Sequence, residues 1–296
     1  MAFAHPEYLV DTAWLAAHLD DPGVLVLDAT THLIPAAGAG YTVQPGRADF
    51  EQGHIPGAQF VDLQADLSDP THEFRFMLPT PEHFAASLSR LGVGDATRVI
   101  LYSTANAWWA TRVWWLLRVF GHDNAAVLDG GFQKWRAERR PAETGPGKTR
   151  SPGHFTARAP RPLMADKTEV LAAINNGSIC TINALRPEQH TGSGGVQYGR
   201  PGRIAGSVNV AASQLVDPTT NAFLPAEELR VKFEAVGAMD RSVITYCGGG
   251  IAASADALVL TMLGHKDVKL YDASLSEWVK DPTLPMETGK EESSFF

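Results

Sequence analysis

One succession of motifs occurs twice along the 296 residues of this chain. Each half has an apolar strand, an Ile-x-Gly motif, a helix, a second strand, a further helix that ends in Gly-His, and a third strand. The strands at 24–28 and 98–102 have counterparts at 178–182 and 242–246. Strands that alternate with helices form parallel sheets whose crossover connections are the helices. The repeat therefore predicts an α/β protein of two tandem domains, each a mostly parallel sheet flanked by helices.

The stretch between the two copies has the composition of a linker. Residues 140–162 are rich in proline, glycine and basic residues and show no apolar period. We therefore expect a first domain over residues 7–140, a linker over 141–163 and a second domain over 164–290. Within the first domain, the Gly- and Pro-containing segment that runs to Phe50 is expected to be a loop.

The charge balance and the distribution of apolar residues exclude several classes of function. The chain has 33 acidic and 25 basic residues, a net charge of −8 and no basic run, so a nucleic-acid partner is not expected. No segment approaches the roughly 20 apolar residues of a membrane span, and the N-terminus lacks the regions of a signal peptide. Two cysteines, Cys180 and Cys247, are too few for a disulfide framework. We therefore expect a cytoplasmic protein in a reducing setting, with no membrane partner.

Cys247 follows a strand of the second repeat, at a point where α/β proteins place their chemistry. The β-branched strand at 242–246 leads into Cys247 and three glycines, and an apolar helix follows over 255–263. Glycines allow successive backbone N–H groups to turn toward one anion, and a helix N-terminus adds partial positive charge. Because such a setting stabilises a thiolate, Cys247 is a candidate nucleophile. The residues expected to cradle its product are Gly248, Gly249, Gly250, Ile251, Ala252 and Ala253.

Three chemistries use a loop of this kind, and the residues separate them in part. A cysteine phosphatase or arsenate reductase needs an arginine six residues after the cysteine, and Ala253 occupies that position. A dinucleotide site needs G-x-G-x-x-G/A, which Gly248, Gly250 and Ala253 match, but few residues follow for the further βα units of such a domain. The third chemistry is the storage of a sulfur atom on the cysteine as a persulfide.

The equivalent loop of the first repeat has no thiol. Ser103 stands in the place of the cysteine, and residues 104–109 bring side chains where the second copy has glycines. Ser103 is not in a G-x-S-x-G elbow, so a serine hydrolase is not supported. We expect the first domain to be catalytically silent and to supply one wall of a cleft.

These motifs, in this order and present twice, resemble those of the rhodanese family, the tandem-domain thiosulfate and 3-mercaptopyruvate sulfurtransferases. The resemblance extends over nearly the whole chain. It rests on Gly-His-Ile-Pro-Gly-Ala at 53–58 with its echo at 203–207, on the Cys247 loop, and on the segments 129–132 and 271–278. In that family only the C-terminal copy carries the catalytic cysteine, in agreement with the serine at 103.

The resemblance implies a sulfurtransferase that works by double displacement. Cys247 would take sulfane sulfur from thiosulfate or 3-mercaptopyruvate, a small anionic donor, and pass it to cyanide, a thiol or a protein thiol. Such covalent catalysis needs oriented amides and little acid–base chemistry, so neither a metal nor a cofactor is expected. A persulfide carrier or redox-sensing binding module with little small-molecule turnover is an alternative of a different class. A nucleotide-binding oxidoreductase is a third, supported only by the glycine pattern.

The residues that would select the donor depart from the family pattern. Relatives tend to carry cations or a serine just after the cysteine, where this chain has glycines. Arg186 looks like the family's substrate-binding arginine, and His190 stands where a second arginine is expected. Asp62 matches the aspartate of the mercaptopyruvate enzymes, and Arg75 could reach over from the first domain. An anionic donor needs a cation in the cleft, so these four residues are the candidates for substrate binding.

Overall fold

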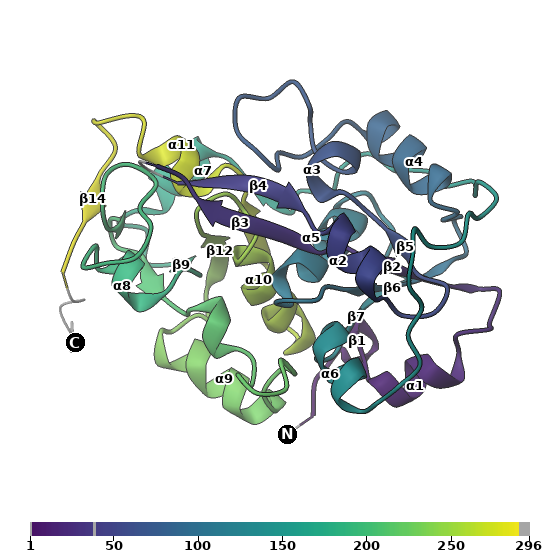
Figure 1. Ribbon diagram of the computed structural model, residues 1–296. Coiled ribbons are helices and arrows are strands. Elements are labelled where there is room, and N and C mark those ends of the chain that lie inside the picture. Colours follow the sequence, from purple (N-terminus) through teal and green to yellow (C-terminus); the bar gives the residue numbers. More distant parts are fainter. Residues whose placement is uncertain (1, 38–39, 290–296) are drawn as a thin grey trace.

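The structure is a computed structural model that describes residues 2–37 and 40–289. The chain forms two α/β domains side by side, each built on a five-stranded sheet (Figure 1). The expected end of the second domain, residue 290, lies just outside the described residues. The domain limits 7–140, 141–163 and 164–290 stay predictions.

The two sheets repeat one topology strand for strand. The N-terminal sheet has the order β1-β7-β6-β2-β5, the C-terminal sheet has the order β8-β13-β12-β9-β11, and every pairing in both is parallel. The N-terminal strands are β1 (Leu9–Val10), β2 (Val24–Asp28), β5 (Gln59–Phe60), β6 (Arg98–Tyr102) and β7 (Ala125–Leu128). The C-terminal strands are β8 (Met164–Ala165), β9 (Ile179–Asn183), β11 (Val208–Asn209), β12 (Ser242–Tyr246) and β13 (Val268–Tyr271). The fold class expected from the repeat is therefore confirmed.

Helices flank both sheets, and two small antiparallel pairs complete the fold (Figure 1). The N-terminal helices are α1 (Thr12–Ala17), α2 (Arg47–Gln52), α3 (Leu63–Asp66), α4 (Pro81–Arg90), α5 (Trp108–Val119) and α6 (Gly131–Ala137). The C-terminal helices are α7 (Lys167–Ala173), α8 (Pro187–His190), α9 (Ala226–Ala235), α10 (Ala253–Met262) and α11 (Ser274–Trp278). Short 3₁₀ turns occur at Pro6–Tyr8 and Ala212–Gln214, and the antiparallel pairs are β3 (Thr31–Pro35) with β4 (Tyr41–Pro45) and β10 (Arg203–Ile204) with β14 (Met286–Glu287).

The central strands are buried along almost their whole length. Every residue of β2 is buried, and in β6, β9 and β12 only the first residue is partly exposed. Parallel strands covered on both faces have continuous apolar sequences rather than alternating ones, which makes them easy to locate. The strands predicted at 24–28, 98–102 and 242–246 are confirmed residue for residue, and the one predicted at 178–182 lies one residue later.

The two domains meet along α5 and α10, which lie against each other at the centre of the molecule (Figure 1). All residues of α10 are buried, because its apolar surface contacts its own sheet as well as α5. Two hydroxyl groups, Oγ1 of Thr111 and Oγ of Ser254, form a hydrogen bond of 2.7 Å across this interface. The helix begins at Ala253, two residues before the predicted start, so the loop after Cys247 is short.

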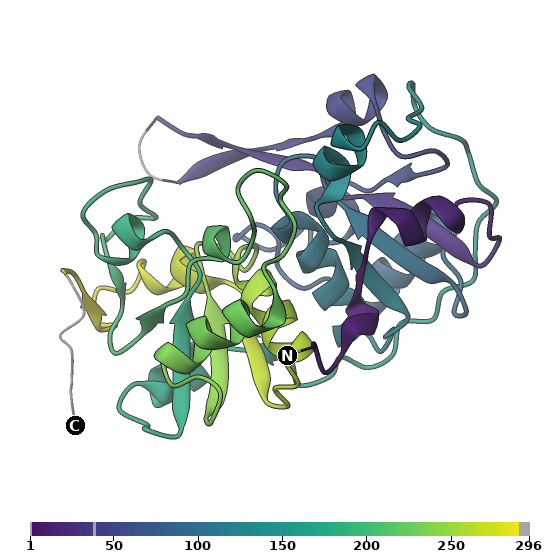
Figure 2. The same ribbon diagram turned by 90° about the horizontal axis from the view of Figure 1, so that it is seen from below.

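The segment expected to be a loop up to Phe50 contains a β-hairpin instead. Strands β3 and β4 pair in an antiparallel register, and α2 follows directly. Figure 2 shows this hairpin extending from the N-terminal domain over the C-terminal one. There the backbone N–H of Gly40 donates to the carbonyl of Gln197 at 2.9 Å. The hairpin thereby becomes part of the boundary between the domains.

The segment over 141–163 runs along the N-terminal domain. It includes an isolated bridge between His54 and Glu143, and Phe155 is buried against Phe84, with 5.9 Å between the ring centroids. No helix within residues 2–37 and 40–289 is long and apolar enough to cross a bilayer. In the same residues, no cluster of three His, Cys, Asp or Glu side chains is placed to hold a metal ion.

Candidate active site

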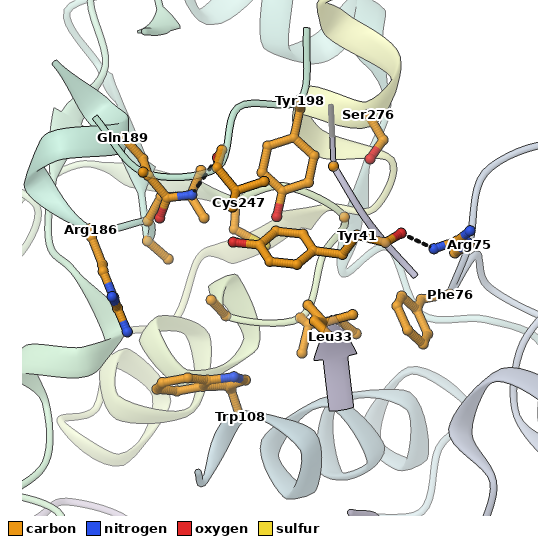
Figure 3. A pocket seen from close by; sticks show the side chains of 18 of the residues that line it. Leu33, Tyr41, Arg75, Phe76, Trp108, Arg186, Gln189, Tyr198, Cys247 and Ser276 are labelled. Atoms are coloured by element: carbon orange, nitrogen blue, oxygen red, sulfur yellow. Dashed lines mark hydrogen bonds between the residues drawn. The ribbon is translucent and has the colours of Figure 1, made fainter. Parts of the chain in front are cut away.

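Cys247 lies at the carboxyl end of β12, between that strand and the loop that leads into α10. Ligands of α/β proteins bind at this edge of the sheet. The cysteine is 2% exposed, and it lines a cavity of about 610 Å³ whose walls come from both domains. Figure 3 shows the rings of Tyr198 and Tyr41 beside Cys247, with Leu33 and Trp108 beyond Tyr41.

Ser274 holds the backbone of the cysteine loop. Its Oγ accepts the N–H of Cys247 at 3.1 Å and that of Gly250 at 3.2 Å, and donates to the carbonyl of Tyr271 at 2.7 Å. Ser274 itself is fully buried and has a φ of +52°. One of the amides expected to cradle an anion, that of Gly250, is therefore already used by the protein, as is the amide of Cys247 itself.

Other amides of the loop remain available. Within the described part of the chain, the N–H groups of Gly249, Ile251 and Ala252 have no hydrogen-bond acceptor, and all three residues line the cavity. They lie just before the N-terminus of α10, whose partial positive charge favours an anion at this place. The loop can thus hold a negatively charged sulfur species with backbone donors alone.

The three glycines of the loop have different physical roles. A Cβ at Gly248 would lie 1.8 Å from Cζ of Tyr198, so the absence of a side chain there admits the tyrosine ring. Gly250 has a φ of +73°, and a Cβ there would lie 2.7 Å from the carbonyl oxygen of Asp272. At Gly249 the nearest atom would be Ser276 Oγ at 3.7 Å, an ordinary contact. Positive φ is therefore a requirement at Gly250 alone.

A buried arginine of the N-terminal domain contacts the cysteine loop and a residue that packs on it. Arg112 of α5 is fully buried, and its Nη2 lies 2.6 Å from Oδ1 of Asp272 in the C-terminal domain. The same guanidinium donates to the carbonyl of Phe76 and, at a long 3.5 Å, to that of Gly250. The other carboxylate oxygen of Asp272 accepts the N–H of Leu78 at 2.7 Å. The loop geometry thus depends on both domains.

The walls of the cavity are largely apolar and aromatic. The β3–β4 hairpin contributes Leu33, Tyr41 and Val43. Trp108, the first residue of α5, also lines the cavity; it lies in the segment of the first repeat that has large side chains where the second repeat has glycines. By contrast, Ser103 is buried outside the lining, and its hydroxyl donates to the carbonyl of Asn106.

Two of the four expected substrate-binding residues line the cavity. Arg186 precedes α8 and is exposed, and within the described residues its guanidinium forms no hydrogen bond or ion pair. Arg75 donates to the backbone carbonyl of Tyr41 in the hairpin, as Figure 3 shows. A third cation of the lining, Lys280, pairs with Glu73 at 2.8 Å. Arg186 is therefore the cation most available to an anionic donor.

The other two expected residues, Asp62 and His190, do not line the cavity. Asp62 caps the N-terminus of α3, where its Oδ1 accepts the N–H groups of Gln64 and Ala65 at 3.1 Å each. His190 is 2% exposed, and burial together with the nearby charge of Arg203 lowers its pKa to about 4. Its imidazole is thus neutral at pH 7 and does not supply the second cation. The structure accordingly does not bring either side chain to Cys247.

Sequence reasoning missed Tyr198, Arg112 and the hairpin. Tyr198 stands in a glycine-rich segment after α8 that has no period, so no local pattern marks it. Arg112 carried a usable signal, since it is a charged residue inside the apolar stretch Trp-Trp-Ala-Thr-Arg-Val-Trp-Trp. A charge in such a helix must find a partner when it is buried.

Two copies of one parallel α/β domain, with a cysteine loop at the sheet edge of the second, define a class of tandem-domain α/β protein. The family model of the rhodanese-like domain matches residues 11–138 and 166–281. The chain therefore belongs to the rhodanese family of sulfurtransferases, as its motifs suggested.

Relatives of known name are similar over almost the full length. The chain is 34% identical to the 3-mercaptopyruvate sulfurtransferase of Escherichia coli K12, over 96% of this chain and 99% of the relative. It is 32% identical to the sulfur carrier protein TtuD of Thermus thermophilus, over 98% of this chain and 100% of the relative. The crystal structure of SseA from E. coli, a 3-mercaptopyruvate sulfotransferase by its description, matches 91% of this chain and 99% of its own with a TM-score of 0.77 and 34% identity.

Proposed function

We propose that this protein transfers sulfane sulfur from 3-mercaptopyruvate or thiosulfate to a thiophilic acceptor through a persulfide on Cys247. The observation that carries the proposal is Cys247 beside unpaired loop amides, in a cavity that also contains the guanidinium of Arg186. The similarity to a 3-mercaptopyruvate sulfurtransferase over nearly the full length supports the same chemistry.

In the first half-reaction, Arg186 binds the anionic oxygens of the donor and orients its sulfur toward Cys247. The thiolate attacks that sulfur, a sulfur–sulfur bond forms, and the bond between this sulfur and the rest of the donor breaks. The electron pair leaves with the first product, which is sulfite from thiosulfate or the enolate of pyruvate from 3-mercaptopyruvate. The N–H groups of Gly249, Ile251 and Ala252 stabilise the persulfide that remains.

In the second half-reaction, the acceptor attacks the outer sulfur of the persulfide. Cyanide leaves as thiocyanate, a thiol leaves as its own persulfide, and Cys247 returns as the thiolate. This covalent route divides the transfer into two displacements and needs no further group. A reducing, cytoplasmic setting would keep Cys247 as a free thiol between turnovers.

A second candidate function is that of a persulfide carrier. It is favoured by the 32% identity to the sulfur carrier TtuD and by a cysteine loop without any charged side chain. In this case Cys247 would accept sulfur from a protein persulfide and turn over small donors only slowly.

The test is the intact mass of the protein after incubation with each donor. We expect the wild type to gain one sulfur atom and Cys247→Ser to gain none. Cys180→Ser is the matched control, because this second cysteine is buried in β9 and does not line the cavity. It should gain sulfur like the wild type.

The outcomes separate the two candidate functions. Sulfur gain with rapid formation of thiocyanate from cyanide supports the enzyme, whereas gain without turnover supports the carrier. No gain from either donor would overturn the proposal of a small-molecule enzyme. A gain that persists in Cys247→Ser would remove Cys247 as the site.

A further inference from the structure

The negative charge that develops on the leaving product needs a hydrogen-bond donor near Cys247. When the carbon–sulfur bond of 3-mercaptopyruvate breaks, the electron pair moves onto the carbonyl oxygen of the forming enolate. Sulfite, the leaving group of thiosulfate, spreads its charge over three oxygens and needs less help. No side chain of the loop supplies a donor, because residues 248–250 are glycines. The free loop amides stabilise the persulfide, so a side-chain donor for the leaving oxyanion must come from a residue outside the loop.

The hydroxyl groups of two serines near the loop already donate hydrogen bonds to backbone carbonyls. The hydroxyl of Ser274 donates to the carbonyl of Tyr271 at 2.7 Å, and that of Ser276 donates to the carbonyl of Gly248 at 2.6 Å. A serine hydroxyl has a single proton to donate. Either serine could serve the substrate only by releasing a backbone carbonyl that it now holds.

Tyr198 is placed differently. A Cβ at Gly248 would lie 2.0 Å from the hydroxyl oxygen of Tyr198, so this hydroxyl lies directly beside the residue that follows Cys247. Tyr198 lines the cavity, and within the described chain its hydroxyl has no hydrogen-bond partner. In Figure 3 the ring stands next to Cys247 on the cavity side. The hydroxyl therefore has a proton available where the donor must lie.

The surroundings keep this hydroxyl protonated. Burial raises the pKa of Tyr198 far above its usual value, and the neighbouring ionisable groups Cys247 and Tyr41 act in the same direction. A phenol that stays neutral at every working pH is a permanent hydrogen-bond donor. It can stabilise an oxyanion without giving up its proton.

We propose that Tyr198 is a catalytic residue in sulfur transfer from 3-mercaptopyruvate. As the carbon–sulfur bond breaks, the enolate oxygen of the forming pyruvate accepts a hydrogen bond from the tyrosine hydroxyl. The proposal rests on the sulfurtransferase function proposed above. The electron pair of the broken bond goes to the enolate, whose carbon then takes a proton from water to give pyruvate and hydroxide. The thiol proton of the donor stays on the new persulfide, and Tyr198 keeps its own. Thiosulfate forms no enolate and depends little on this hydrogen bond.

The test is Tyr198→Phe, which keeps the ring over Gly248 and removes only the hydroxyl. We expect single-turnover formation of the Cys247 persulfide from 3-mercaptopyruvate to slow by about 100-fold, the effect of losing one oxyanion donor. The rate with thiosulfate should stay within about threefold of the wild type, because the same ring still packs on the loop. With 3-mercaptopyruvate, kcat should fall while KM stays nearly constant, since the hydrogen bond strengthens only as charge develops.

Tyr271→Phe is the control, because this tyrosine is buried in the same domain and bonds Glu277 at 2.6 Å, outside the cavity lining. It should leave the ratio of the two donor rates unchanged. Equal slowing with both donors in Tyr198→Phe, or no slowing with 3-mercaptopyruvate, would overturn the role of Tyr198 and leave the sulfurtransferase function intact. A wild type that accepts sulfur only from thiosulfate would also overturn it, whereas a wild type that accepts none from either donor would overturn the proposed function as well.

Discussion

The three glycines after Cys247 cannot be told apart in the sequence, but each has a different structural role. Gly250 has a positive φ that favours glycine, and the ring of Tyr198 occupies the space that a side chain at Gly248 would need. A Cβ at Gly249 would make only ordinary van der Waals contacts. The loop after Cys247 is therefore not uniformly intolerant of side chains. The difference makes Gly249 a matched control for its neighbours.

Gly250→Ala should destabilise the protein by about 1–3 kcal/mol, because a Cβ in a left-handed conformation is strained and would also clash with the carbonyl of Asp272. Gly249→Ala should change the free energy of unfolding by less than about 0.5 kcal/mol. Urea unfolding of both variants, followed by tryptophan fluorescence, measures the difference. Equal losses in the two variants would contradict the assignment.

Arg186→Ala should weaken the use of both donors without loss of stability. The side chain is exposed and forms no ion pair within the described residues, so its removal leaves no buried group unpaired. We expect KM for thiosulfate and for 3-mercaptopyruvate to rise by about 10-fold or more, the scale of one charge-assisted hydrogen bond. Arg186→Lys, which keeps the charge, should recover part of the affinity. Unchanged kinetics in Arg186→Ala would show that another cation binds the donor.

At the scale of the elements, equivalent strands end on different residues. Strand β2 ends at Asp28, whose Oδ1 accepts the N–H of Thr30 at 2.8 Å, and β9 ends at Asn183, whose Oδ1 accepts the N–H of Leu185 at 3.0 Å. The same hydrogen bond to the amide two residues later is thus accepted by a carboxylate in the first repeat and by a neutral amide in the second. Burial raises the pKa of Asp28 to about 6, although hydrogen bonds from Thr30 oppose the shift.

Asp28→Asn should therefore stabilise the protein above pH 6 and have little effect near pH 4. The unfolded chain loses this proton at about pH 4 and the folded chain at about pH 6, so the free energy of unfolding of the wild type falls as pH rises through that window. The variant lacks this fall and should be more stable at pH 8 by on the order of 1–3 kcal/mol. Urea titrations at pH 4, 6 and 8 provide the measurement. Asn183→Asp should show the opposite dependence, and a pH-independent difference would contradict the mechanism.

The features that could be predicted from the sequence are those determined by residues close together in the chain. The buried strands, the apolar helices and the Cys247 loop each depend on neighbouring residues, and the structure has them close to the predicted positions. The hairpin of β3 and β4 was missed because its strands are mostly exposed or half-buried and do not alternate clearly. Asp62 shows the converse, since an acid in the expected place serves as a helix cap.

At the scale of the whole molecule, the site is assembled by segments that are distant in the chain. Arg112 and the hairpin reach the cysteine loop and its cavity through packing between the domains, and Tyr198 comes from a distant loop of the C-terminal domain, so no motif encodes these contacts. The N-terminal domain lacks a thiol in its own loop, yet it supplies a wall, a cation and a support for the loop of its partner domain.

The clearest measure of this dependence is the buried ion pair of Arg112 and Asp272. Arg112→Leu would leave the carboxylate of Asp272 buried without its charge partner, and breaking such a pair costs about 3–5 kcal/mol. We expect that loss in urea unfolding, together with slower persulfide formation, because Gly250 loses a contact as well. Asp272→Asn combined with Arg112→Leu should regain about 1–3 kcal/mol, since the amide carries no charge and can still accept the N–H of Leu78. Additive losses in the double variant would mean that the two side chains act separately, and that the N-terminal domain supports the loop by packing alone.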